Sequence, residues 1–210
     1  MSDAFIREVD EDLRQKQLND LWKKFGKFII GAAVGIVLIV AGRAIYTNMV
    51  ESKYSAQATK FSAALKQDEN TVLSALDTVV TSDVVGYKIV ATFKQAELAI
   101  AAEDYPKAIS ILDNFIASAD VPQIYKDMAS IQASMLDLDT ATTDQIRARL
   151  SLVLNGDSGF QHLGEELIAL SELKSGNVDA ARERFKTLTE NVEVPNSVKT
   201  RAGQYLSVIE

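Results

Sequence analysis

The chain has 210 residues, and its 29 Asp and Glu against 22 Lys and Arg give a formal net charge of −7 at pH 7. The lack of cysteine excludes disulfides, thiolate metal sites and cysteine nucleophiles, and one histidine, His162, argues against a His-paired or His-ligated catalytic centre. An acidic chain without a basic stripe is poorly suited to nucleic acid. We therefore expect no cofactor, no metal, no nucleic-acid partner and no enzymatic activity.

Residues 1–27 form the first predicted element, an amphipathic cytoplasmic segment. Apolar side chains recur every three to five residues from Phe5 to Phe25, with charged residues between them. Trp22 and Phe25, beside a lysine cluster, suit the interface of a membrane with the cytoplasm. The pattern predicts a helix that either rests on the bilayer or docks a partner at the cytoplasmic face.

Residues 28–46 are predicted to cross a membrane. The stretch from Phe28 to Gly42 contains no charge, and 19 helical residues cover roughly 28 Å, close to the hydrocarbon thickness of a bilayer. A cleaved signal peptide fits poorly, because the preceding segment is long and carries six acidic residues. A buried helix of a soluble protein also fits poorly, because the stretch is apolar on every face.

The orientation of the span follows from the basic residues on each side. Six lysines and arginines precede it, whereas Arg43, Lys53 and Lys60 follow within a similar distance. The more basic side stays in the cytoplasm, so we expect a cytoplasmic N-terminus and a periplasmic C-terminal domain in a bacterial inner membrane.

Small residues line one face of the predicted span at Gly31, Gly35 and Gly42. Such spacing permits close packing of two membrane helices. This candidate transmembrane packing face predicts contact with a second copy, giving a homodimer, or with another membrane protein.

Residues 47–210 are predicted to form an all-α domain made of antiparallel helix pairs. Few prolines and many strong helix formers favour helices throughout. The expected helices cover residues 71–81, 84–102, 106–118, 123–138, 143–154, 160–174, 178–190 and 195 to the C-terminus. The turns are marked by sequences such as Glu103-Asp104-Tyr105 and Ser175-Gly176-Asn177.

Two of these helix pairs can be superimposed on each other. In each, a small residue lies twelve positions before an alanine, which is followed four positions later by an apolar residue; the two sets are Ala96, Ala108, Leu112 and Ala169, Ala181, Phe185. Small residues there let two antiparallel helices approach closely. The 73-residue offset equals two periods of 34 plus five, and a period of 34 is typical of tetratricopeptide repeats. The sequence therefore predicts a tetratricopeptide-like α-solenoid after one transmembrane helix.

The repeat register also predicts a partner groove. In such solenoids the first helix of each pair lines one surface. We expect Val90, Phe93, Glu97 and Ile100 of the helix over residues 84–102 to line this candidate groove and to contact a protein segment.

The whole chain resembles a known family, the ancillary SecYEG translocon subunits, which are YfgM-like single-span proteins, in their alphaproteobacterial form. The resemblance is most specific from Phe5 to Arg14 and in Leu21-Trp22-Lys23-Lys24-Phe25-Gly26, which leads into the span. It implies a periplasmic adaptor that links Sec translocon subunits to a periplasmic chaperone, isomerase or translocated chain. The alternative is a scaffold for cell-envelope assembly or division without translocon contact.

Overall fold

The computed structural model describes residues 2–68 and 71–209, and for residues 2–15, 17–21, 26, 29 and 33 it describes the backbone alone. These residues form ten α-helices and no strand, which confirms the all-α prediction. The chain divides into two compact units, Met1–Ser55 and Ala56–Glu210.

The first unit consists of helix α1, which begins at Ser2 and continues to Ala64, past the unit boundary. Consecutive large side chains from Ile36 to Val40 are all more than half exposed, so the helix is apolar around its full circumference. In the part of the chain that is described, the segment Ile30–Ala64 is the one helix long and apolar enough to cross a membrane. Most side chains of the predicted amphipathic segment, residues 1–27, lie outside the described residues.

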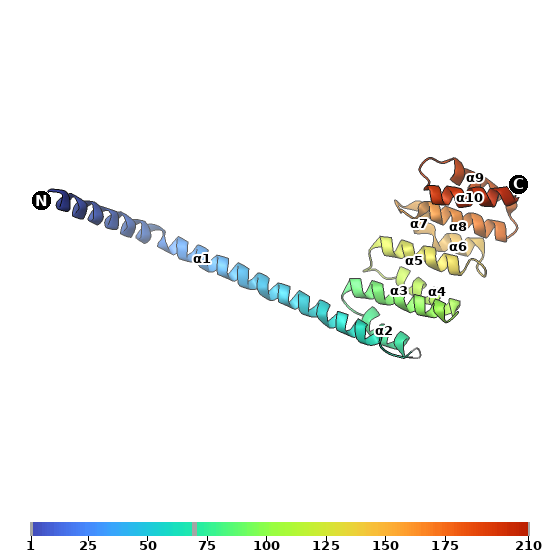
Figure 1. Ribbon diagram of the computed structural model, residues 1–210, viewed down its shortest axis with the longest axis horizontal. Coiled ribbons are helices and arrows are strands. Elements are labelled where there is room, and N and C mark those ends of the chain that lie inside the picture. The colour runs from blue at the N-terminus through green and yellow to red at the C-terminus, as the bar shows by residue number, and fades with distance from the viewer. Residues whose placement is uncertain (1, 69–70, 210) are drawn as a thin grey trace. The chain divides into compact units, whose positions relative to one another are not determined.

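The second unit contains nine shorter helices in its described part (Figure 1). They are α2 (Val72–Val80), α3 (Val85–Ala101), α4 (Tyr105–Ile116), α5 (Gln123–Leu136), α6 (Thr143–Arg149), α7 (Ser151–Asn155), α8 (Gln161–Lys174), α9 (Val178–Glu190) and α10 (Asn196–Ile209). The closest packing joins helices that follow one another in sequence, such as α3 with α4, and α8 with α9. This nearest-neighbour packing is typical of helical repeats.

One predicted helix is divided. The sequence predicts a continuous helix over residues 143–154, whereas the structure has α6 and α7 with Leu150 between them. At Leu150 ψ is 2°, which interrupts the α-helical run, although the side chain stays fully buried beside Ile146 and Val153.

The turns α3–α4 and α8–α9 have the same backbone geometry. Glu103 has φ 58° and Gly176 has φ 82°, so both turns need a left-handed residue. In each turn the next residue donates its N–H back five positions at 2.9 Å, from Asp104 to the carbonyl of Ala99 and from Asn177 to that of Glu172. Such bonds close the C-terminus of a helix before the chain reverses. The two turns are 73 residues apart, which is the offset seen in the sequence.

Separate apolar clusters fill the second unit. The last residues of α1 belong to one of them, since Ala64 and Phe61 pack with Leu76 of α2 and Ala91 of α3. The rings of Phe61 and Tyr87 have centroids 6.2 Å apart. The N-terminal edge of the repeat array is therefore covered by the end of α1 rather than exposed to water.

Candidate functional site

The predicted groove residues lie on the outer side of α3. Val90 is 51% exposed, and Glu97 is exposed and pairs with Lys94 at 2.8 Å. Phe93 and Ile100 are half-buried. Phe93 packs edge-on against Phe115 of α4 with ring centroids 5.5 Å apart, so it contributes to the core as well as to the surface.

Helix α5 carries a more apolar surface than α3, and sequence reasoning missed it. Ile124, Met128 and Met135 are 51%, 37% and 56% exposed. Their spacing of four and seven residues places them on one face of the helix. The opposite side buries small residues, among them Ala129, Ser130, Ala133 and Ser134. These three apolar side chains are therefore open to solvent on one face of α5. The regular spacing of the small residues on α5 was a sequence signal for the buried face.

The predicted repeat-packing residues lie inside the unit. Ala96, Ala108 and Leu112 of the first helix pair have no exposed surface, and neither do Ala169, Ala181 and Phe185 of the second. Phe185 also stacks on Tyr205 of α10, with ring centroids 5.1 Å apart. The same three positions of each pair thus sit where two helices meet.

Buried carboxylates on α8 join this helix to its neighbours. Glu172 accepts hydrogen bonds from Arg147 of α6 and from Arg184 of α9, and Arg184 also pairs with Glu165. The hydrogen bond with Glu172 is the largest cause of the raised pKa of Arg184; burial opposes it and Glu165 adds to it. These charged groups are paired with one another and join α8 to α6 and α9.

A second charged group lies where α4, α5 and α6 meet. The guanidinium of Arg149 binds Asp113 at 2.8 Å and Asp137 at 3.0 Å. Burial works against the charge of Arg149, but the two carboxylates outweigh it and raise its pKa. Arg149 is the last residue of α6, so this group joins α4 and the end of α5 to α6 just before the break at Leu150.

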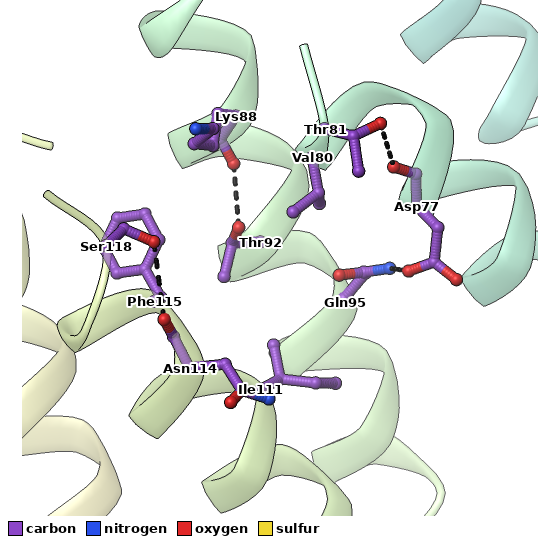
Figure 2. A pocket seen from close by; sticks show the side chains of 10 residues that line it. All are labelled: Asp77, Val80, Thr81, Lys88, Thr92, Gln95, Ile111, Asn114, Phe115 and Ser118. Carbon is purple, nitrogen blue, oxygen red and sulfur yellow. Dashed lines mark hydrogen bonds between the residues drawn. The ribbon is translucent and has the colours of Figure 1, made fainter. Parts of the chain in front are cut away.

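A groove of about 370 Å³, lined by both polar and apolar side chains, lies between α2, α3 and α4 (Figure 2). Its floor is formed by Lys88, Thr92 and Gln95, which recur at the helical spacing of four and three residues. Val90 and Glu97 lie about half a turn away on α3. The groove and these two exposed residues therefore occupy opposite faces of the same helix. We call it the α2–α4 groove.

The glycines of the predicted span are open to other molecules. A methyl group added at Gly31, Gly35 or Gly42 would meet nothing within 4 Å. Close approach by another helix at this face is therefore sterically allowed.

Paired antiparallel helices, matching turns and nearest-neighbour packing define the second unit as a helical repeat protein of the protein-interaction class. Residues 19–200 match the tetratricopeptide repeat-like domain family, and the chain belongs to that family. Comparison with curated proteins and with solved structures gave no match. Domains of this family are in general non-catalytic interaction modules, and nothing in the described part of the chain points to enzymatic activity.

Proposed function

We propose that the protein is a membrane-tethered adaptor of the bacterial inner membrane, with its helical domain in the periplasm. In this proposal it is an ancillary factor of the Sec translocon and brings a periplasmic chaperone, isomerase or translocated chain to it. The resemblance of the N-terminal segment to ancillary translocon subunits supports the partner, and the excess of basic residues before the span supports the orientation.

The observation that carries the adaptor role is the outward apolar face of α5, made by Ile124, Met128 and Met135. Thioether side chains are flexible and polarisable, so they adapt to partners of different shape. The matching exposed residue on α3 is Val90. Together these first helices offer a protein segment an apolar surface within an acidic unit, in which residues from Ala56 onward include 22 Asp and Glu against 14 Lys and Arg.

The tether strengthens binding without additional contacts. A single span confines the domain to a thin layer beside the membrane, which raises its effective concentration near any membrane-bound partner. The face at Gly31 and Gly35 would let the span pack closely against a translocon helix or against a second copy of this chain.

Photo-crosslinking in intact membranes tests the proposal. A photo-reactive residue would replace Met128 on the apolar face or Gly35 in the span, and a matched control would replace Ser110, which is exposed on the second helix α4. We expect translocon subunits at Gly35 and a folding factor or nascent chain at Met128, with neither at Ser110. Capture of envelope-assembly proteins alone would favour the scaffold alternative and contradict the translocon role.

Self-association is tested separately. If the glycine face joins two copies, Gly31→Leu with Gly35→Leu abolishes the crosslinked dimer, because the larger side chains keep the helices apart. An unchanged dimer would rule out this face as its cause.

A further inference from the structure

The α2–α4 groove contains a buried amide whose orientation is fixed. The Gln95 side-chain nitrogen donates to the carbonyl of Leu73 at 2.9 Å and to Asp77 Oδ1 at 2.6 Å. Both partners are acceptors, so only the amide nitrogen can face them. The amide oxygen must then point the other way, and Figure 2 shows it directed into the space between the labelled side chains.

Gln95 as a residue is largely buried, and its side-chain oxygen, which faces the groove, accepts no hydrogen bond from the described residues. Gln95 is only 6% exposed. The Gln95 oxygen is therefore able to accept a hydrogen bond from a ligand that enters the groove.

Two hydroxyl groups of the groove can also accept hydrogen bonds. The hydroxyl of Thr81 donates to the carbonyl of Asp77 at 3.1 Å, and that of Thr92 donates to the carbonyl of Lys88 at 2.9 Å. Their oxygens keep lone pairs that can accept from a ligand. The ammonium of Lys88 forms an ion pair with Asp120, with 2.7 Å between Nζ and Oδ2. The groove thus offers acceptors at Thr81, Thr92 and Gln95 beside the carboxylate of Asp77, together with donors at Asn114 and Lys88.

We propose that the α2–α4 groove binds an arginine side chain of a partner polypeptide. A guanidinium offers five N–H donors in a plane and carries the charge that Asp77 attracts. It is also weakly hydrated, so it loses little when apolar side chains cover its faces. Val80, Ile111 and Phe115 supply such cover on the groove walls (Figure 2).

This inference rests on the proposed adaptor function, because it assigns the chemistry of one contact with the protein partner. It places that contact on the face of α3 opposite Val90 and Glu97. A partner segment that also reaches α5 would therefore touch the repeat unit on two sides.

NMR of the full chain in lipid nanodiscs, with labelled methyl groups at Val80, Thr92 and Ile111, tests the site. The probe is N-acetyl-arginine amide, and N-acetyl-citrulline amide is the neutral control of the same shape. We expect saturable shifts of these three methyl groups with the arginine probe, at a dissociation constant of about a millimolar, the range for a single side chain. The citrulline probe should bind at least about fivefold more weakly, the effect of one partly exposed ion pair.

Two variants separate the groove from general acidity. Asp77→Asn keeps an oxygen that accepts from Gln95 but removes the charge, and should weaken arginine binding about fivefold. Asp144→Asn removes the same charge from an exposed carboxylate of α6 and should change nothing. Equal effects of both variants, equal binding of citrulline, or shifts only outside the groove would overturn the proposal.

The result of the NMR binding test does not depend on the result of the crosslinking test. Absence of arginine binding together with partner capture at Met128 would overturn the groove and leave the adaptor role. Arginine binding without any captured partner would support the groove and contradict the adaptor role.

Discussion

Removal of Arg201 should destabilise the C-terminal helices because it leaves a buried charge alone. Arg201 of α10 donates two hydrogen bonds to Glu166 of α8, at 2.7 and 2.6 Å. The side chain of Glu166 is 4% exposed and that of Arg201 is 44% exposed. The hydrogen bond with Glu166 is the largest cause of the raised pKa of Arg201, with burial opposing it.

The expected magnitude follows from these exposures. Breaking a fully buried ion pair by removing one partner costs about 3–5 kcal/mol. Water reaches nearly half of Arg201 and would solvate part of the exposed carboxylate, so we halve this figure and expect about 2 kcal/mol for Arg201→Met. The double variant Glu166→Met with Arg201→Met removes both charges and should lie within about 1 kcal/mol of the original protein.

Hydrogen exchange of the full chain in nanodiscs, followed by mass spectrometry, measures the effect locally. For Arg201→Met we expect amide exchange in α8 and α10 to rise about 30-fold, with α3 unchanged, because repeats contact mainly their neighbours. Lys94→Met, which breaks the exposed pair with Glu97, is the control and should cost under about 1 kcal/mol. If the double variant is as unstable as Arg201→Met, the loss comes from side-chain packing, and the buried-charge explanation is wrong.

Three further changes test other parts of the unit. Phe185→Ala removes a fully buried ring stacked on Tyr205 and should cost about 3–5 kcal/mol in urea unfolding; a loss below about 1 kcal/mol would contradict its place in the core. Ala133→Leu should cost about 1–3 kcal/mol by overpacking, whereas Met135→Ala should cost under about 0.5 kcal/mol, and the reverse order would show that α5 faces the other way. The hydrogen bond from Lys88 lowers the pKa of Asp120 below its ordinary 3.8, so the stability from this pair is present at neutral pH and lost as the pH falls through the lowered pKa. Carbon NMR titration should show that pKa return toward 3.8 in Lys88→Met, and no change would exclude the pair as its cause.

The helices and turns were predictable because their signals are local. Pro106 and the turn residues Glu103 and Gly176 mark reversals within a few positions, and the structure places left-handed backbone at both turn residues. The helix bounds at α3, α5, α8 and α9 agree with the expected ones to within two residues.

The exposed apolar face of α5 and the burial of Gln95 were less predictable because they depend on distant neighbours. Met128 and Met135 are apolar and would be expected inside a helix pair, yet close packing of α5 favours alanine and serine there. Gln95 is polar and would be expected in water, but it is buried by partners 18 and 22 residues away. Neither the exposure of these methionines nor the burial of Gln95 follows from the spacing of residues within a single helix.

The exposed methionines of α5 make this helix sensitive to oxidation. Two of the four methionines in the chain, Met128 and Met135, lie on its apolar face. Oxidation to the sulfoxide turns such a side chain polar and chiral, and it proceeds most readily where the sulfur is accessible to solvent. Peroxide would therefore make the apolar face of α5 more polar while leaving the buried contacts between helices unchanged, and reductive repair of the sulfoxide would restore it.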